Sequence, residues 1–474
     1  MKIVGRERER RVLSRCEESP KPEFVAVYGR YRVGKTFLIA EHFGNKFTFS
    51  VTGVAGGGMK EQLRVFHDAL EKHFKDDVAV PKDWRQAFGL LEERLEQDIT
   101  LGKKVLFIDE IPWLDTPKSG FLAALEHFWH AFASKRRDIL LIVCGSAAGW
   151  IIKKLLKNQG GLPSSVTETV VVEPFSLGDC EKFYRSRGIA MNRQQIAEAY
   201  MILGGIPYYM EAMDKMSGLS QNIDLLLFHK NAKLGDELSK LYNPLFRYAG
   251  NHICLAETLS KSAAGLTRQE LSAASGISDG GGLSKVLDEL AACGFVDSSR
   301  DFKKKNSGDY YKLADFYTLF YFNFLHKQKG RGAHFGSNFL SLPAHRAWRE
   351  YAFERLCLAH IRQIKQKLGI SGVITQTYAY RSSQQKEGCQ ISLIIDRRDA
   401  VLNLCECKFT AQPYELTAHD AADLGRKKAV FLQETGTKKS IQTTIISANG
   451  LAHNAYCNDI QAEITLDDLF KPIL

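Results

Sequence analysis

The stretch from Gly29 to Thr36 reads Gly-Arg-Tyr-Arg-Val-Gly-Lys-Thr and decides the fold of the first part of the chain. It matches the pattern G-x-x-x-x-G-K-[ST], in which backbone N–H groups close around phosphates, the lysine reaches the β and γ phosphates and the hydroxyl ligates Mg²⁺. An apolar strand-like run, EFVAVYG, precedes the pattern, and an amphipathic run, KTFLIAEHF, follows it. The sequence therefore predicts an ATP-binding loop between a strand and a helix. Its residues are Gly29, Arg30, Tyr31, Arg32, Val33, Gly34, Lys35 and Thr36.

Two acidic residues end the next buried strand that the sequence predicts, in the run VLFIDE at residues 105–110. A carboxylate at the exposed end of such a strand can hold Mg²⁺, and a second one beside it can polarise the attacking water. We expect Asp109 to bind the metal together with Thr36, and Glu110 to act as the general base.

A third apolar run, ILLIVC at residues 139–144, is followed by Gly-Ser. Short apolar runs of this kind, separated by helical patterns, are typical of parallel strands buried on both faces. We expect Ser146 to lie near the γ-phosphate, so that the predicted catalytic residues are Lys35, Glu110 and Ser146.

Composition bounds the class of protein. The chain has 474 residues, 45% hydrophobic and 25% charged, with a formal net charge of +10. At about 100–200 residues per domain, this length predicts several domains. No run approaches the ~18 apolar residues of a membrane span, and no apolar segment follows the charged N-terminus. The ten cysteines include no C-x-x-C and the thirteen histidines no H-E-x-x-H, so we assign none to zinc. We expect a cytoplasmic protein without membrane contact.

The pattern changes beyond the strand-rich first part. Residues 176–248 are helical in pattern and predict a lid subdomain. Two short helical patterns and two strand-like ends around a polar loop then predict a winged helix-turn-helix. A weakly patterned linker and a helix followed by strands complete the chain. The predicted parts are 1–175 (P-loop ATPase core), 176–248 (lid), 249–320 (winged helix), 321–343 (linker) and 344–474 (C-terminal α/β domain).

Several motifs resemble a known family. The quoted segments are GRERE, GRYRVGKT, LFIDEIPWL, VCGSAAGWI, GGLPSSVTETVVVEPF and GGIPYY. Together they resemble the prokaryotic archaeal-type AAA+/STAND-like ATPases, whose C-terminal domain is related to PD-(D/E)xK nucleases. The resemblance implies a multidomain α/β protein: a P-loop NTPase, a helical lid containing residues 204–209, a winged helix, and a restriction-endonuclease-like domain. It also implies that Ser146 is the polar residue of the third ATPase motif.

The sequence departs from the family after the GGL segment. The family usually carries basic residues where this chain has Pro163, Ser164, Ser165 and Glu168. An arginine that neutralises charge on the γ-phosphate can raise turnover by orders of magnitude. We therefore expect slow hydrolysis, since Arg136 and Arg137 are substitutes by residue type alone.

The C-terminal part carries an E-x-K element, Glu406 and Lys408, on one face of an apolar strand. The resemblance implies that Glu354 is the early acidic residue of a nuclease site. It also implies an aspartate where this chain has Ser392. Asp396 is four residues further along the strand, roughly 13 Å away at about 3.3 Å per residue, and cannot replace it. We expect weak or absent phosphodiester cleavage.

The positive charge concentrates between residues 303 and 349, which hold nine basic and two acidic residues. If DNA binds, we expect contact here, first of all with Lys303, Lys304 and Lys305. Three functions remain open: an ATP-driven switch coupled to DNA, an ATP-regulated metal-dependent nuclease, and a nucleotide-binding scaffold that recruits a protein partner without nucleic acid. A homo-oligomer is compatible with each.

Overall fold

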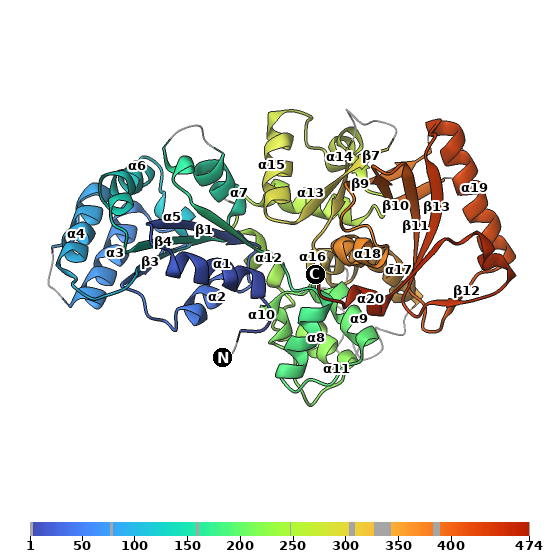
Figure 1. The fold of residues 1–474 in the computed structure, drawn as a ribbon, viewed down its shortest axis with the longest axis horizontal. Helices are drawn as coiled ribbons and strands as arrows, with labels where there is room; N and C mark the ends of the chain where they lie inside the picture. The colour runs from blue at the N-terminus through green and yellow to red at the C-terminus, as the bar shows by residue number, and fades with distance from the viewer. Residues whose placement is uncertain are drawn as a thin grey trace. The chain divides into compact units, whose positions relative to one another are not determined.

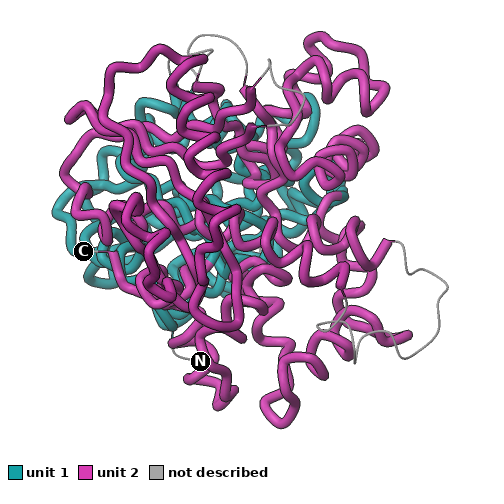
Figure 2. The backbone as a smooth tube through the Cα atoms, turned by 90° about the vertical axis from the view of Figure 1, so that its right-hand side faces the viewer, with its two compact units in different colours: residues 1–174, 243–247 teal, residues 175–242, 248–474 magenta. Residues whose placement is uncertain are grey.

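The computed structural model describes residues 3–75, 79–157, 161–246, 248–302, 309–326, 343–382 and 389–473. The chain divides into two compact units (Figure 2). Unit 1 comprises Met1–Pro174 and Asn243–Arg247, and unit 2 comprises Phe175–Tyr242 and Tyr248–Leu474. Within the described ranges, none of the helices combines the length and the apolar character needed to cross a membrane.

Unit 1 is built on a five-stranded parallel sheet in the order β2-β3-β4-β1-β5. Its strands are β1 (Glu23–Gly29), β2 (Phe49–Thr52), β3 (Lys104–Asp109), β4 (Ile139–Gly145) and β5 (Glu168–Val172). The central strands β3 and β4 are buried along their whole length. Parallel strands need helical crossovers that cover both faces, which explains their continuous apolar runs.

Helices cover this sheet (Figure 1). They are α1 (Glu7–Glu18), α2 (Lys35–His42), α3 (Met59–Phe74), α4 (Trp84–Gln97), α5 (Ile111–Leu114), α6 (Phe121–His127) and α7 (Ala148–Ile151). An aromatic core joins α3, α4 and α6 to the sheet: Phe66 packs edge-on against Trp84, and Trp84 against Phe121. Burial of such large side chains supplies much of the stabilisation of a domain.

Unit 2 begins with helices α8 to α12 and contains an eight-stranded sheet in the order β15-β13-β11-β10-β9-β7-β8-β6. Its helices are α8 (Leu177–Ser186), α9 (Arg193–Leu203), α10 (Pro207–Met210), α11 (Leu219–Ile223), α12 (Glu237–Tyr242), α13 (Gly250–Ser260), α14 (Arg268–Ser275), α15 (Gly281–Ala292), α16 (Phe316–Phe320), α17 (Pro343–Ala359), α18 (Ile361–Lys367), α19 (Ala418–Thr435) and α20 (Leu466–Leu469). Its strands are β6 (Leu266–Thr267), β7 (Val296–Asp301), β8 (Asp309–Leu313), β9 (Thr375–Arg381), β10 (Gln390–Arg397), β11 (Val401–Lys408), β13 (Ser440–Ser447) and β15 (Ala462–Thr465), with β12 (Tyr414–Glu415) and β14 (Leu451–Ala452) paired separately.

The eight-stranded sheet crosses a boundary that the sequence pattern predicts between two domains. Strand β7 pairs in parallel with β9, in the register Arg300 to Tyr378 and Asp301 to Ala379. Phe302, directly after β7, packs its ring edge-on against Tyr378. The hairpin β7–β8 and the strands of the C-terminal part therefore share one sheet.

The predicted linker is wrong at its start. Residues Tyr321–Leu325 continue α16 as a helical turn, and four of their side chains are buried: Tyr321, Phe322, Phe324 and Leu325. Aromatic residues at helical spacing fill a core here. The helix therefore continues past position 321, where the linker is expected to start. Within the range of the predicted linker, residues 327–342 lie outside the described residues, and Pro343 begins α17.

Candidate nucleotide-binding site

The loop between β1 and α2 depends on two glycines. A Cβ at Gly29 would lie 2.1 Å from the carbonyl oxygen of Val172, so only glycine permits this approach of β1 to β5. Gly34 has a φ of 88°, a left-handed conformation that glycine adopts without strain. The two positions that the motif requires to be glycine are thus required by the backbone as well.

Lys35 lies at the start of α2 with only 4% of its surface exposed. Its ammonium group donates to the carbonyl oxygens of Gly29 (3.2 Å) and Arg30 (2.9 Å) and to the Ser146 hydroxyl (2.9 Å). These contacts hold a positive charge at the carboxyl ends of β1 and β4, inside the loop. The sequence-predicted residues Lys35 and Ser146 are therefore in direct contact, although they are 111 positions apart.

Thr36 and Asp109 also meet. The Thr36 hydroxyl donates to Asp109 Oδ2 at 2.7 Å, and the backbone N–H of Glu110 donates to Oδ1 at 2.9 Å. Asp109 is 3% exposed, so a buried carboxylate and a hydroxyl stand together at the ends of α2 and β3. Hard oxygen ligands of this kind are the ones that Mg²⁺ prefers, and the pair fits a magnesium ion.

Glu110 turns toward the third motif. The Ser146 hydroxyl donates to Glu110 Oε1 at 2.6 Å, and the Ser146 backbone N–H lies 3.2 Å from Oε2. Glu110 has a φ of 45°, in the left-handed region where a residue with a side chain costs of order 1–3 kcal/mol. Strain of this kind persists only where surrounding contacts impose it, and the two hydrogen bonds to Ser146 are such contacts.

Arg6 belongs to this site, although no sequence motif gave it a role. Its guanidinium donates to the carbonyl oxygen of Val33, inside the loop, at 3.0 Å, and to that of Glu173 at 2.6 Å. The side chain is buried, with 9% of the residue exposed. The sequence shows a Gly-Arg pair directly before α1, but no local pattern indicates that Arg6 contacts residues 33 and 173.

Arg136 could by residue type stand in for an arginine at the γ-phosphate, but its side chain makes other contacts. Arg136 donates to both carboxylate oxygens of Asp138, at 3.0 and 2.6 Å, and to the Leu95 carbonyl oxygen at 2.8 Å. The neighbouring Arg137 is exposed. Glu168 pairs with Arg15.

The E-x-K element of β11 lies on the face of the sheet covered by α19. Leu402 and Leu404, on the same face as Glu406, pack with Phe431 of α19 in one core cluster. The antiparallel register of β10 and β11 pairs Leu393 with Cys405, and β10 changes register against β9 between Ile391 and Ile394, the segment that holds Ser392. Glu406 and Lys408 are in contact, 3.3 Å apart, whereas the Ser392 hydroxyl accepts from the Gln390 side chain at 3.4 Å.

Glu354 is not part of that group. Its carboxylate pairs with the buried Lys312 of β8 at 3.3 Å. One turn further along α17, Cys357 interacts with Cys407, which points to the other face of β11 from Glu406. The role of Glu354 as the early acidic residue of a nuclease site, which the resemblance implies, stays a prediction, and in the structure its carboxylate pairs with Lys312.

Two basic residues of the stretch in which DNA contact is predicted are buried or paired. Lys312 is completely buried, and Arg349 pairs with Glu198 at 2.8 Å, so neither contributes a free charge to a surface. Both count among the nine basic residues between 303 and 349. The predicted contact residues Lys303, Lys304 and Lys305 lie outside the described residues.

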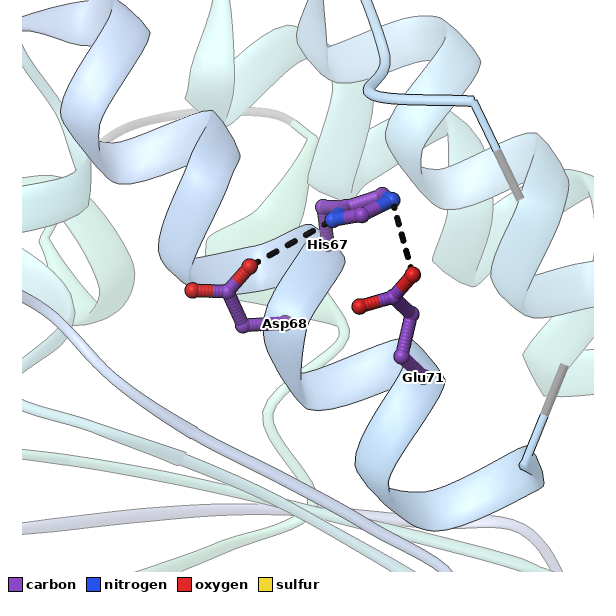
Figure 3. Close-up of side chains that lie close together, drawn as sticks. All are labelled: His67, Asp68 and Glu71. Atoms are coloured by element: carbon purple, nitrogen blue, oxygen red, sulfur yellow. Dashed lines mark hydrogen bonds and ion pairs between the residues drawn. The ribbon is translucent and has the colours of Figure 1, made fainter. Parts of the chain in front are cut away.

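Helix α3 carries a group of possible metal ligands, His67, Asp68 and Glu71 (Figure 3). One ring nitrogen of His67 lies 3.4 Å from the Asp68 carboxylate, and the other lies 3.6 Å from that of Glu71. Asp68 is exposed and Glu71 is half-buried, and exposed acidic groups are common without a metal ion. We assign this group no function.

Comparisons with known proteins place this geometry in context. No protein-family model matches the chain. The uncharacterized protein MJECL04 of Methanocaldococcus jannaschii is 26% identical over 209 residues, 44% of this chain and 43% of that protein, so the match spans less than half of the relative. The Walker-type ATPase PABY2304 of Pyrococcus abyssi has a TM-score of 0.50 and 17% identity, covering 68% of this chain and 96% of its own. The ORC2 protein of Aeropyrum pernix has a TM-score of 0.40 and 11% identity, covering 68% and 93%. The likeness to PABY2304 shows a shared fold, and the chain is a multidomain α/β protein that contains a parallel sheet.

Proposed function

We propose that unit 1 binds ATP with Mg²⁺ and hydrolyses it. The observation that carries this proposal is the contact chain from Lys35 through Ser146 to Glu110, beside the pair formed by Thr36 and Asp109. These groups lie at the start of α2 and at the carboxyl ends of β3 and β4, which meet at one edge of the parallel sheet. A phosphate charge, a metal ligand and a general base are the parts that phosphoryl transfer requires.

Each residue has a distinct role in this proposal. The backbone N–H groups of the loop and the Lys35 ammonium bind the β and γ phosphates. Thr36 and Asp109 hold Mg²⁺, which supplies positive charge against the developing charge of the transferred phosphoryl group. Glu110 orients the attacking water and accepts its proton, and Ser146 fixes the direction of the Glu110 carboxylate.

We expect the turnover to be slow for this chain alone. The family's basic positions are occupied by other residues, and Arg136 is held by Asp138. A second copy of the chain or a protein partner that supplies an arginine in trans would raise the rate. A concentration dependence of the specific activity would report such a partner.

We propose further that nucleotide state is coupled to DNA through α14, α15 and the hairpin β7–β8, interpreted as a winged helix. Two helices followed by a hairpin support that interpretation. The C-terminal part then acts as a degenerate nuclease-like domain, because Ser392 stands where a carboxylate is needed. Nuclease activity is the second hypothesis, and a scaffold without nucleic acid is the third.

Three measurements separate these functions. ATP turnover of the wild type and Lys35→Ala, with and without duplex DNA, tests the ATPase and its coupling. DNA binding at increasing salt separates the switch from the scaffold, since phosphate contacts give an affinity that falls steeply with salt. A triple Lys303, Lys304 and Lys305→Ala variant should bind DNA more weakly and with a shallower dependence of affinity on salt.

Nicking assays with Mg²⁺ or Mn²⁺ on wild type and Ser392→Asp test the nuclease hypothesis. Robust wild-type cleavage that is lost in Lys408→Ala would establish it.

A further inference from the structure

The carboxylate of Glu406 is engaged by two ammonium groups. Lys408, on the same strand, lies 3.3 Å from Oε1, and Lys427, on α19, lies 3.0 Å from Oε2. Each oxygen of the carboxylate thus faces its own positive charge. The partner from α19 is the unexpected one, because it is 21 residues away in the chain and belongs to no motif.

Lys427 bridges two carboxylates. Besides Glu406 of β11, its ammonium contacts Asp423 Oδ2 of α19 at 3.2 Å. The side chain is 18% exposed, so the charge is largely withdrawn from water. Burial opposes that charge, but Glu406 and Asp423 outweigh the burial and the pKa of Lys427 is raised. A positive charge therefore stands between two carboxylates from different elements, as a bound cation would.

The other positions of the implied metal site do not fit a divalent cation either. Ser392, on the neighbouring strand β10, offers a neutral hydroxyl in place of a carboxylate. Glu354 is paired with Lys312 and lies near the face of β11 that carries Cys407. A Mg²⁺ ion needs several hard oxygen ligands in near-octahedral geometry, whereas the Glu406 carboxylate already faces two lysines and the nearby Asp423 carboxylate pairs with one of them.

We propose that the Lys427 ammonium takes the place of the divalent cation in the C-terminal domain, and that the Glu406 site is a metal-free ion-pair cluster. This inference rests on the proposed nuclease-like character of the domain. It accounts for the loss of the aspartate at position 392, because an internal ammonium needs fewer anionic partners than a divalent ion. It also predicts that removing the ammonium and restoring the carboxylate creates a cation site.

The test measures Mn²⁺ binding to full-length, nucleotide-free protein by electron paramagnetic resonance of the free ion. The proteins are the wild type, Glu406→Gln, Ser392→Asp, and the double variant Ser392→Asp with Lys427→Met. We expect wild type and Glu406→Gln to bind Mn²⁺ identically, and the double variant to gain one site at least tenfold tighter than Ser392→Asp shows. A matched control combines Ser392→Asp with Lys428→Met, which removes the neighbouring lysine of α19 and should gain no site.

Two results would overturn the proposal. One is a wild-type Mn²⁺ site that disappears in Glu406→Gln, which would mean that a cation binds despite Lys427. The other is a folded double variant, verified by circular dichroism and its unfolding midpoint, that gains no site. If the double variant does not fold, the comparison of wild type with Glu406→Gln still decides. Because no nucleotide is present, the outcome is independent of whether unit 1 hydrolyses ATP.

Discussion

The Ser146 hydroxyl donates a 2.6 Å hydrogen bond to the Glu110 carboxylate. The same hydroxyl oxygen lies 2.9 Å from the Lys35 ammonium, so one serine joins the proposed base to the proposed phosphate-binding charge. A strand-end serine is an ordinary turn residue in many proteins. Here the serine lies between two charged groups and contacts both.

Glu110→Gln separates catalysis from binding. Loss of the base should lower ATP turnover by about 10²–10⁴-fold and leave nucleotide affinity within a few-fold, because the amide retains size but accepts no proton. Ser146→Ala should lower turnover less, since the carboxylate remains but loses its orientation. Single-turnover hydrolysis and equilibrium binding of a fluorescent ATP analogue measure the two effects. The matched control is Glu93→Gln, an exposed carboxylate of α4. Equal losses of binding and turnover in Glu110→Gln would contradict the role of base.

Thr36→Val and Asp109→Asn test the metal assignment. Each removes one hard oxygen ligand or its charge, so the Mg²⁺ concentration that gives half-maximal turnover should rise at least about tenfold. Titration of turnover with Mg²⁺ at fixed ATP measures this. Thr258→Val serves as the control, because that hydroxyl donates to a carbonyl oxygen within its own helix. An unchanged Mg²⁺ requirement in both variants would show that the metal lies elsewhere.

The buried ion pair of Lys312 with Glu354 predicts that Lys312→Met destabilises the protein more than the loss of an exposed ion pair does. Lys312 is completely buried and Glu354 is 20% exposed, so Lys312→Met leaves a partly buried carboxylate without its partner. We expect a loss of about 3 kcal/mol of unfolding free energy for unit 2. Lys261→Met, which removes one side of an exposed pair with Glu257, should cost less than about 1 kcal/mol. Urea unfolding with hydrogen exchange of β8 measures both, and equal losses would contradict the burial argument.

His360 predicts an acid-sensitive stability. Its Nε2 accepts the Leu177 N–H at 3.0 Å, so Nδ1 carries the proton and donates to the Leu356 carbonyl oxygen at 2.9 Å. Burial lowers its pKa to about 4, from an ordinary value of 6.5. The neutral ring is therefore stabilising above pH 6.5. As the pH falls from 6.5 to about 4, the unfolded chain binds the proton first, and up to about 3 kcal/mol is lost.

Unfolding midpoints of wild type and His360→Gln between pH 7.5 and 4.5 test this dependence. The variant should be less stable at neutral pH but should lose less stability on acidification. His419→Gln, at an exposed histidine, should follow the wild type. A wild-type pH dependence that persists unchanged in His360→Gln would assign it to other groups.

Local patterns were enough to predict which residues lie near the loop from Gly29 to Thr36, but not the partners of the charged residues in the C-terminal part. The loop from Gly29 to Thr36 is contiguous, and the strand that ends at Asp109 is a buried apolar run, so periodicity and motif agree. Because parallel strands bring their carboxyl ends to one edge, the sequence alone also suffices to place Ser146 near the phosphate loop. Arg6 could not be placed in this way, since its two carbonyl partners are fixed only by the folded backbone.

The missed contacts share one cause. Lys312 lies in a basic stretch, Glu354 fits a family position, and Tyr321 follows a predicted domain, yet each is buried or paired by residues distant in the chain. The sequence does not reveal which residue a charged or aromatic side chain will contact. For Lys312 and Glu354, the partner is known only once β8 and α17 are placed in the fold. The parallel pairing of β7 with β9 is of the same kind, because no turn or spacing specifies it.

The central claim is that unit 1 is an ATPase built on Lys35. Its most direct test is the steady-state ATP turnover of the full-length wild type and Lys35→Ala, each with and without duplex DNA. We expect measurable Mg²⁺-dependent turnover in the wild type, higher with DNA, and loss of both in Lys35→Ala. Turnover that is unchanged by Lys35→Ala would contradict the account.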